Sequence, residues 1–366
     1  MTQDAMPSAR TLTAGVIGLG WAGQQHMAAY QAMEGVELVA IAGMEEAALA
    51  ELGAEYQLER LYRDGLDLIA AGGLDLISIA VPTFLHAPLS IAASEAGIHV
   101  LSEKPMARTA TESQAMVEAA RTAGRVLEVA FNHRRRGDVA VLKDAIDAGE
   151  LGRPYHARAW WMRRAGIPNM GSWFTNEVMS GGGPLIDIGV HVLDYALYLL
   201  GDPEVTSVSA VTYSEIGVQG RGGSADSARA AVGSTYEVED LASALIRFSN
   251  GSSLALETSW AAYRDIGDEF GITIYGTDGG AELKVKDYLA DVPVKLFRGE
   301  PGNFQDRELT PRANGNHPEV VRDFVAHVRD ESSWAQHDGS EGLKRAVIID
   351  ACYASAAAGT EVEVTR

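Results

Sequence analysis

The chain has 366 residues and a formal net charge of −20, with 46% hydrophobic and 22% charged residues. This length predicts two domains, and the composition is typical of a soluble globular protein. The negative charge argues against a nucleic-acid or anionic-membrane partner, because both of these are polyanions. The single cysteine, Cys352, excludes an intrachain disulfide and gives no support for a cysteine-based zinc site.

The first ten residues, MTQDAMPSAR, contain no apolar run of the kind found in secretory signals. Elsewhere in the sequence, no apolar run approaches the length that is needed to span a membrane. We therefore expect a cytoplasmic protein without a membrane partner.

A glycine-rich stretch organises the first half of the chain. Residues 14–26 read AGVIGLGWAGQQH, in which a short apolar run ends at a glycine and a helical pattern follows. In the dinucleotide-binding pattern G-x-G-x-x-G, the first glycine permits a tight turn, the second lets a pyrophosphate approach the backbone, and the third lets the helix pack on the strand. The helix N-terminus offers free N–H groups to the phosphates. We predict a cofactor site, rather than a glycine-rich surface turn, formed by Gly18, Gly20, Trp21, Ala22 and Gly23.

Alternating strands and helices follow this turn. Strands are expected over residues 36–42, 74–81, 98–101 and 126–131, and helices over residues 21–33, 45–54, 88–96 and 111–123. The strands are apolar on both faces, which indicates a parallel sheet that is covered by helices on both sides. The sequence therefore predicts a doubly wound Rossmann domain over residues 1–133.

The second half, residues 134–366, has the pattern of an α+β domain. Strands are expected over residues 155–162, 205–213, 242–248, 254–260, 270–275 and 281–285, with Asn250-Gly251 as a hairpin signal. We expect a large, mainly antiparallel sheet with one face under helices and one open face free for a partner subunit. Helices over residues 318–329 and 340–357 close the chain, the second with Ser340 as its N-cap. The segment 217–234 is rich in Gly, Ala and Ser, and we expect a flexible surface loop rather than an active-site lid or a subunit-contact arm.

The residue after the second predicted strand bears on cofactor choice. An acid at this position normally binds the adenosine ribose of NAD, but Gly43 occupies it and Met44 follows. The sequence places no arginine beside it for the 2′-phosphate of NADP. Glu45 can reach back to the ribose, but the simpler interpretation is that it is an acid in the first turn of a helix, where it interacts favourably with the helix dipole. The expected cofactor is NAD or NADP, with the choice left open.

Two further strand ends should face the same crevice. The fourth predicted strand ends in SEKP, residues 102–105, which puts the ammonium group of Lys104 near the nicotinamide and the substrate oxygen. The proline of this turn is a candidate for a cis peptide bond. A solvated Glu–Lys turn is the alternative interpretation. After the third strand, Pro82, Thr83 and His86 are predicted to touch the cofactor, unless they only begin a helix.

Residues 181–201, GGGPLIDIGVHVLDYALYLLG, are apolar nearly all round and predict a buried helix over residues 184–200. Its polar members, Asp187, His191 and Asp194, stand at i, i+4 and i+7 and should share one face. Because unpaired buried polar groups are costly, this face is either a self-satisfied Asp–His pair or the wall of an active site with His191 as proton carrier. No third ligand stands at a spacing that suggests a metal, so we expect no metal site.

Four weaker candidates complete the predicted substrate site. Asn132 and Arg134 follow a strand end at the domain junction, where a solvated charge run is the alternative. Arg164 and Trp173 lie in a segment rich in arginine and tryptophan, residue types that bind hydroxyl groups and stack on sugar rings. Packing or an oligomer contact explains the tryptophans equally well.

With GLGWAGQQH, SEKP and DIGVH in this order, the chain resembles the Gfo/Idh/MocA family of oxidoreductases over nearly its whole length. That family includes inositol dehydrogenase, glucose–fructose oxidoreductase and many sugar dehydrogenases. The resemblance implies a Rossmann domain, a second domain with a large open sheet, and NAD(P)-dependent oxidation or reduction of a sugar or cyclitol. It also implies a homo-oligomer, a dimer or tetramer, formed partly through that sheet. We further expect the C-terminal helix to pack back on the first domain.

The resemblance also assigns roles to single residues. Lys104, Asp187 and His191 match the family's catalytic positions. Gly43 departs from the family pattern, because many NAD-using members have Asp at this position. NADP-using relatives often have a small residue there with Ser, Arg or Lys nearby, and Met44 is none of these.

The resulting hypothesis is an oxidoreductase that transfers hydride between nicotinamide and a ring hydroxyl or keto group of a sugar, glycoside or cyclitol. His191 takes the hydroxyl proton, Lys104 stabilises the developing alkoxide, and Asp187 orients His191. The predicted cofactor-binding residues are Gly18, Gly20, Trp21, Ala22, Gly23, Gly43, Met44, Pro82, Thr83, His86, Glu103 and Lys104. The predicted substrate-binding residues are Lys104, Asn132, Arg134, Arg164, Trp173, Asp187 and His191. Two alternatives stay open: an NAD-dependent glycoside hydrolase that acts through a transient keto-sugar, and a non-catalytic ligand-sensing member.

Overall fold

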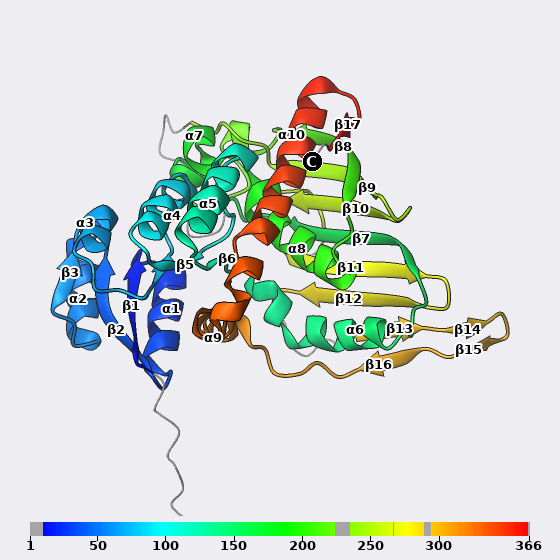
Figure 1. The fold of residues 1–366 in the computed structure, drawn as a ribbon. Helices are drawn as coiled ribbons and strands as arrows, with labels where there is room; N and C mark the ends of the chain where they lie inside the picture. Colours follow the sequence, from blue (N-terminus) through cyan, green and yellow to red (C-terminus); the bar gives the residue numbers. More distant parts are fainter. Residues whose placement is uncertain (1–9, 224–234, 266, 289–293, 365–366) are drawn as a thin grey trace, which may run out of the picture.

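Two β-sheets, lying side by side, form the scaffold of the molecule (Figure 1). The computed structural model describes residues 10–223, 235–265, 267–288 and 294–364. A six-stranded sheet belongs to the first part of the chain, and a nine-stranded sheet belongs to the second. Within the described residues, no helix has the length and apolar character that crossing a membrane requires.

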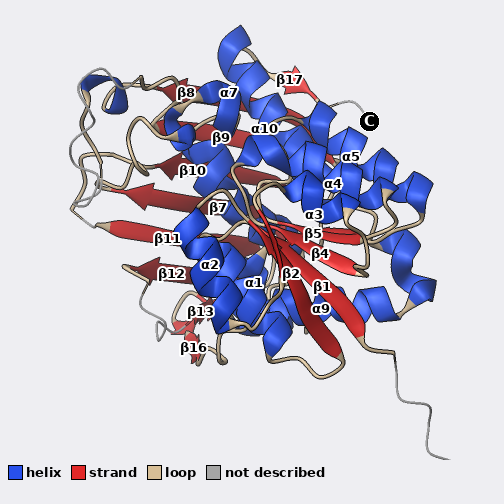
Figure 2. Cartoon of the chain, turned by 90° about the vertical axis from the view of Figure 1, so that its left-hand side faces the viewer, coloured by secondary structure: helices blue, strands red, loops and turns tan. Residues whose placement is uncertain are grey.

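The first sheet is parallel and has the strand order β3-β2-β1-β4-β5-β6. Its strands are β1 (Leu12–Ile17), β2 (Val36–Ala42), β3 (Arg60–Tyr62), β4 (Leu76–Ile79), β5 (His99–Ser102) and β6 (Leu127–Val129). Its helices are α1 (Trp21–Gln31), α2 (Glu46–Glu55), α3 (Gly65–Ala70), α4 (His86–Glu95) and α5 (Ala110–Ala123). Helices α1 and α2 bury one core against this sheet, and α3, α4 and α5 bury another (Figure 2). The predicted doubly wound sheet is confirmed, and its order reverses between β1 and β4, where such sheets bind ligands.

Two elements of this sheet were not predicted. Strand β3 has only three residues and none of them is fully buried, so it carries no readable alternation of apolar side chains. Helix α3 has six residues, which is less than two helical turns, and its N-cap is the side chain of Asp64. Both elements are too short for a periodic pattern to predict them.

The second sheet has the order β16-β13-β12-β11-β7-β10-β9-β8-β17. Its strands are β7 (Pro154–Arg163), β8 (Val205–Tyr213), β9 (Leu241–Phe248), β10 (Ser253–Ser259), β11 (Asp268–Gly276), β12 (Gly280–Lys286), β13 (Val294–Phe297), β16 (Arg307–Leu309) and β17 (Val362–Glu363). The strands β14 (Gly299–Glu300) and β15 (Asn303–Phe304) form a separate ribbon. Among the described pairings only β7 and β10 are parallel, so the predicted large, mainly antiparallel sheet is confirmed.

Helices cover one face of this sheet. Helices α6 (Gly137–Asp147), α8 (Val190–Leu199) and α10 (Ser340–Ala358) lie on it, and the short helix α7 (Glu177–Ser180) lies nearer the first sheet (Figure 1). The opposite face carries a hollow of about 510 Å³, whose lining includes Arg158, Trp160, Glu257, Tyr275 and Lys284. The sheet therefore has one covered face and one face with exposed polar and aromatic side chains.

The last two helices return to the first sheet. Helix α9 (Asn316–Arg329) packs against α1, and its Val321 and Phe324 join the core on that side. Helix α10 contacts both α5 and β8, and the Asp350 carboxylate accepts a hydrogen bond from the Ala110 backbone N–H at 2.8 Å. In Figure 1, α9 lies beside α1 and α10 runs between the two sheets. The end of the chain thus fastens the two halves together.

The predicted helix over residues 184–200 is wrong in its first turn. Residues Leu185–Gly189 form a π-helical turn, and the α-helix begins only at Val190. The ammonium group of Lys104 donates to the backbone carbonyl of Asp187 at 3.1 Å, so a side chain occupies an acceptor of the helical ladder. The π turn changes the angular spacing of the residues before Val190, and Asp187 lines the cleft while His191 does not.

The third polar member of this segment, Asp194, is satisfied by arginines. Its carboxylate accepts hydrogen bonds from Arg345 Nε at 3.0 Å and from Arg134 Nε at 2.6 Å. The side chains of Asp194 and Arg345 are buried, and that of Arg134 is 12% exposed. This ion pair network joins α8, α10 and the 3₁₀ turn Asn132–Arg135. The polar residues of this segment therefore have different environments: Asp194 is held in structural ion pairs, whereas Asp187 lines the cleft described below.

The structure corrects the predicted N-cap of the last long helix and describes only part of the predicted loop over residues 217–234. Gly339, not Ser340, is the N-cap of α10, because the Asp338 carboxylate already accepts the Ser340 N–H at 2.9 Å. In the predicted loop, Gly217–Gln219 forms a 3₁₀ turn, while residues 224–234 lie outside the described residues.

The arginine pairs of Asp194 give a prediction about stability. Replacing Asp194 by Ala leaves the guanidinium of Arg345, which is 1% exposed, without its buried counter-charge. We expect unfolding free energy to fall by about 3–5 kcal/mol in urea titrations that are followed by circular dichroism. Asp147→Ala is the control, since Asp147 pairs with Lys143 at the surface and should change stability by less than about 0.5 kcal/mol. Equal losses in the two variants would contradict the assignment of Asp194 as a buried structural counter-ion.

Candidate active site

A cleft of about 1050 Å³ opens at the carboxyl ends of the parallel strands, between the two sheets. Most of the predicted cofactor residues line it: Gly18, Gly20, Trp21, Ala22, Gly43, Met44, Pro82, Thr83, Glu103 and Lys104. The second half of the chain contributes the opposite wall, with Asn169, Trp173, Phe174, Met179, Ser180, Gly182, Ile186 and Asp187. The cleft lies at the switch point between β1 and β4, and its volume is at the upper end of ordinary ligand pockets, about 300–1,000 Å³.

Each of the three glycines of the first turn is glycine for a different physical reason. Gly18 has a φ of +106°, and a Cβ there would lie 2.0 Å from the Ala80 carbonyl oxygen. A Cβ on Gly23 would lie 2.0 Å from the Gly18 carbonyl oxygen, so α1 packs on the strand only because this residue is glycine. A Cβ on Gly20 would meet nothing within 4 Å, because this position faces the open cleft. The turn therefore fits a pyrophosphate held at Gly20 and at the N-terminus of α1, while Gly23 serves packing and is not itself a lining residue.

Gly43, the position of the missing acid, is explained by its neighbour. A Cβ on Gly43 would lie 2.4 Å from the Leu19 side chain, so an aspartate at this position would require the Leu19 side chain to move. Arg63, directly after β3, also lines this end of the cleft and was not predicted. Only the strand pairing identifies Arg63 as a cleft residue: Tyr62 pairs with Ala42 across β3 and β2, and this pairing brings Arg63 beside Gly43.

Lys104 stands at the end of β5 and reaches across to the second half of the chain. The Lys104–Pro105 peptide bond is cis, as the sequence analysis anticipated. The Lys104 ammonium group donates to Asp187 Oδ1 at 2.9 Å, and Trp260 Nε1 donates to Asp187 Oδ2 at 3.0 Å. Burial raises the pKa of Asp187, but the adjacent Lys104, with Arg163 and Trp260, outweighs this and holds the pKa below its usual value. The cleft floor thus carries an ion pair between an ammonium and a carboxylate.

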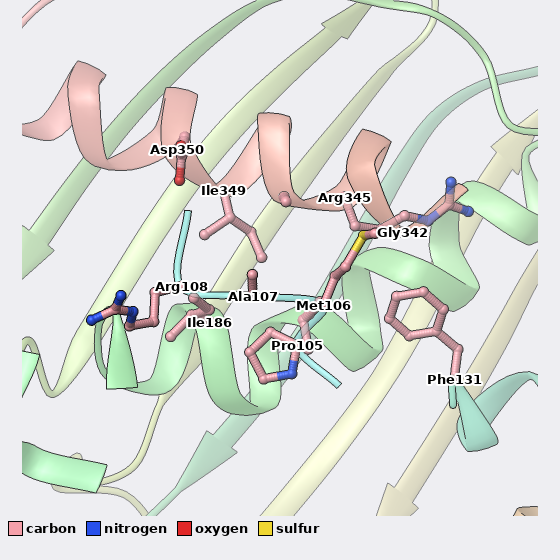
Figure 3. Close-up of a pocket in the computed structure, with 12 residues that line it drawn as sticks. Pro105, Met106, Ala107, Arg108, Phe131, Ile186, Gly342, Arg345, Ile349 and Asp350 are labelled. Carbon is pink, nitrogen blue, oxygen red and sulfur yellow. The ribbon is translucent and has the colours of Figure 1, made fainter. Parts of the chain in front are cut away.

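The back of the Lys104 turn rests on the last helix. Figure 3 shows Pro105 to Arg108 on one side of a small cavity and Gly342, Arg345 and Ile349 of α10 on the other, with Ile186 close by. Because both α10 and the π turn pack against this segment, the position of the ammonium group depends on contacts from the second half of the chain.

His86 does not face the cofactor as predicted. Its Nδ1 lies 2.8 Å from the Pro105 carbonyl oxygen, and its Nε2 lies 2.8 Å from the Val81 carbonyl oxygen. The ring is 1% exposed, and burial lowers its pKa. His86 therefore ties the turn after β4 to the turn that carries Lys104, while Thr83 lines the cleft.

His191 is buried next to the cleft and is not among the described residues that line it. Its ring lies 4.4 Å from that of His133, centroid to centroid, and its Nδ1 has no hydrogen-bond partner among the described residues. Burial lowers its pKa well below 6.5, and the charge of Lys104 acts in the same direction. No Asp187–His191 hydrogen bond occurs among the described residues, where the side-chain donors to the Asp187 carboxylate are Lys104 and Trp260. The structure thus does not support an orienting role of Asp187 toward His191.

Three of the weaker substrate candidates lie outside the described cleft lining, and one lies in it. Trp173 lines the cleft and stacks on Phe174 at 3.8 Å between ring centroids. Arg134 is held by Asp194 and Glu341, Arg164 is exposed to solvent, and Asn132 lies beside His317. Proximity to a strand end or to tryptophans was too coarse a signal to tell these positions from Trp173.

Fold and cleft together define a two-part oxidoreductase with a Rossmann domain that binds NAD. Two family models match the chain: "Oxidoreductase family, NAD-binding Rossmann fold" over residues 12–131, and "GFO/IDH/MocA C-terminal domain" over residues 139–282. The chain belongs to the Gfo/Idh/MocA family of oxidoreductases.

Similar proteins cover the whole chain. It is 34% identical over 369 residues to the D-glucoside 3-dehydrogenase of Escherichia coli (strain K12), which covers 98% of this chain and 100% of that protein. It is 35% identical over 288 residues to the levoglucosan dehydrogenase of Pseudarthrobacter phenanthrenivorans, covering 74% and 73% of the two chains. A solved structure of levoglucosan dehydrogenase with NADH and L-sorbose has a TM-score of 0.82 at 28% identity, covering 98% of this chain and 100% of that chain.

The open position of Gly20 gives a prediction about cofactor binding. Gly20→Val puts a side chain into the cleft without a clash in the protein, so the variant should fold and bind NADH at least about tenfold more weakly. Fluorescence titration measures the affinity, and circular dichroism confirms the fold. Gly23→Val is the contrasting variant, because its side chain collides with the Gly18 carbonyl and should instead lower the melting temperature. Unchanged NADH affinity in folded Gly20→Val would exclude this turn as the pyrophosphate site.

Proposed function

We propose that this protein is an NAD-dependent dehydrogenase that interconverts a ring hydroxyl group and a keto group of a sugar, glycoside or cyclitol. The observation that carries the proposal is the Lys104–Asp187 ion pair on the floor of the cofactor cleft. The printed names of the two similar proteins, a D-glucoside and a levoglucosan dehydrogenase, support a sugar ring as substrate. The stacked rings of Trp173 and Phe174 on the cleft wall offer an apolar surface to such a ring.

The roles of the residues follow from their charges. When bound, NAD supplies the nicotinamide carbon that takes or gives the hydride. Lys104 binds the reacting oxygen and stabilises the negative charge that develops on it. Asp187 holds the Lys104 ammonium group and has lone pairs left to accept a second hydroxyl of the substrate. His191 takes the hydroxyl proton; since its pKa is lowered, the ring is neutral at pH 7, as a proton acceptor must be.

The reaction is tested with NAD⁺ and a panel of sugars, glycosides and cyclitols. Stoichiometric formation of NADH and a keto product supports the dehydrogenase. Cleavage of a glycoside without net NADH formation would instead make the protein a hydrolase that works through a transient keto-sugar. Sugar binding with neither reaction would make it a ligand-sensing member.

We also propose that the protein is cytoplasmic and forms a homo-oligomer through the open face of the nine-stranded sheet. This face carries Trp160 and Tyr275 together with charges of both signs, such as Arg158 and Glu257. A surface with aromatic groups and both charge signs can be complementary to a second copy of itself.

Substitution of the two cross-domain residues tests the mechanism. His191→Ala should lower kcat while NADH affinity stays within about twofold, because His191 does not line the cofactor cleft. Lys104→Ala should lower kcat and also weaken substrate binding. The double variant should lose much less than the product of the two single losses, since both groups serve one transition state. His156→Ala, on the open sheet face, is the control and should keep wild-type kcat.

The pH profile separates the two candidates for the proton acceptor. Because burial lowers the pKa of His191 well below 6.5, its neutral form persists as pH falls, and the acid limb of kcat/KM should lie below pH 6.5. That limb should be absent in His191→Ala. Near wild-type kcat with an unshifted pH profile in His191→Ala would transfer the proton-acceptor role to Lys104.

The oligomer proposal is tested on matched tyrosines. Tyr275, 44% exposed, lines the hollow on the open face, whereas Tyr155, 45% exposed, points to the other side of the same sheet. We expect light scattering to give an oligomer for the wild type and for Tyr155→Arg, and a monomer for Tyr275→Arg. A monomeric wild-type protein would overturn the proposal.

A further inference from the structure

Behind the Lys104 turn, three side chains from distant parts of the chain meet in the protein interior. His26 comes from α1, Glu103 follows β5, and His317 comes from the first turn of α9. Their side chains are 0%, 10% and 6% exposed, respectively. The proposed reaction assigns no role to His26 or His317.

The three groups are close to one another and yet poorly satisfied. Glu103 Oε1 lies 3.2 Å from His26 Nε2 and 3.2 Å from His317 Nε2. Neither ring nitrogen of His26 nor Glu103 Oε1 has a hydrogen-bond partner in the described residues, so these distances are not those of aligned N–H···O bonds. Buried polar atoms without partners are costly, and such a group calls for an explanation.

We propose that His26, Glu103 and His317 bind one divalent transition metal ion of the Zn²⁺ class. Ligand atoms that lie 2.0–2.1 Å from a tetrahedral Zn²⁺ ion are about 3.3–3.4 Å apart, close to the two 3.2 Å separations found here. Two imidazole nitrogens and one carboxylate oxygen suit Zn²⁺ and its neighbours, whereas Mg²⁺ and Ca²⁺ prefer oxygen ligands throughout. Glu103 also lines the cofactor cleft, so the proposed site lies beside it.

The surroundings of the cluster fit a metal site. The Asn132 side-chain nitrogen lies 3.4 Å from His317 Nδ1. The second nitrogen of a ligating histidine donates its N–H to an acceptor, and the Asn132 amide provides one when it is turned to present Oδ1, which has no partner among the described residues. Trp21 packs edge-on against the His317 ring at 5.0 Å between centroids. Glu103 Oε2 accepts the Lys104 backbone N–H at 3.1 Å. A metal here would join α1, α9 and the turn of Lys104, and would thereby fix the backbone beside the proposed catalytic ammonium group.

A second set of two histidines and a glutamate serves as an internal comparison. Glu128 Oε1 lies 2.6 Å from His327 Nδ1 and 2.7 Å from His337 Nδ1, and all three side chains are partly exposed. The His327 contact is a hydrogen bond, and this bond is the main cause that raises the pKa of His327. The second set differs from the first in being partly exposed, and its histidines provide matched control substitutions.

The test measures metal content in untagged full-length protein by plasma mass spectrometry after dialysis against metal-free buffer. We expect one Zn²⁺-class ion per chain in the wild type and in His337→Gln. In His317→Gln, Zn²⁺ affinity in a chelator competition should fall by more than roughly tenfold, the lower end of the loss caused by removing even an outer partner of a metal ligand. Metal-free wild type titrated with Co²⁺ should develop the visible absorption of tetrahedral cobalt.

Each outcome either supports or overturns the proposed metal site. Because metal binding is measured without turnover, these outcomes are independent of the proposed sugar oxidation. Absence of stoichiometric metal in folded wild-type protein, together with no tetrahedral Co²⁺ spectrum, would overturn the proposal and leave the cluster as a proton-sharing group. Metal that is retained in His317→Gln but lost in His337→Gln would overturn it as well, in favour of the set around Glu128. If His317→Gln does not fold, the Co²⁺ titration of the wild type decides alone.

Discussion

The ion pair between Lys104 and Asp187 is the contact on which the geometry of the cleft depends. It joins the end of a parallel strand to a π-helical turn in the other half of the chain, at 2.9 Å. A charge taken out of water is tolerated only when a counter-charge and further hydrogen bonds satisfy it. Here Trp260 donates to the second carboxylate oxygen, and the Asp187 backbone carbonyl also accepts from the ammonium group. The pair therefore holds the two halves in register and concentrates charge where a substrate oxygen can lie.

Other buried charges fix the segment that carries Asp187. Upstream, the Glu239 carboxylate accepts the backbone N–H groups of Gly183 and Leu185 at 2.9 and 3.0 Å, and the Tyr353 hydroxyl donates to it. Downstream, Asp194 is bound by two arginines. Between these two held ends lies the π turn Leu185–Gly189, whose Asp187 lines the cleft. Structural ion pairs and the proposed catalytic pair thus belong to one continuous segment.

Much of the fold and part of the site follow from local patterns. Apolar runs and glycine turns predict the parallel sheet, and β2 and β8 occupy the residues expected for them. The sequence also predicted why Gly18, Gly20 and Gly23 are glycines, because a tight turn and the close packing of a helix on its own strand involve only a few neighbouring residues. Lys104 and Asp187 were identified as site residues from their positions at a strand end and in a buried segment, and both line the cleft.

What only the tertiary structure decided are the partners of these residues. Helical spacing predicted that Asp187 would face His191, and a position after a strand end predicted that Arg134 would meet the substrate. In the structure Asp187 pairs with Lys104, and Arg134 pairs with Asp194. A prediction from helical periodicity assumes an unbroken α-helix, and this assumption does not hold where residues Leu185–Gly189 form a π turn. His26, Glu103 and His317 come from segments far apart in the chain. A sequence determines which groups a protein possesses and their local conformations, whereas the pairing of buried charges depends on which distant segments packing brings within a few ångströms.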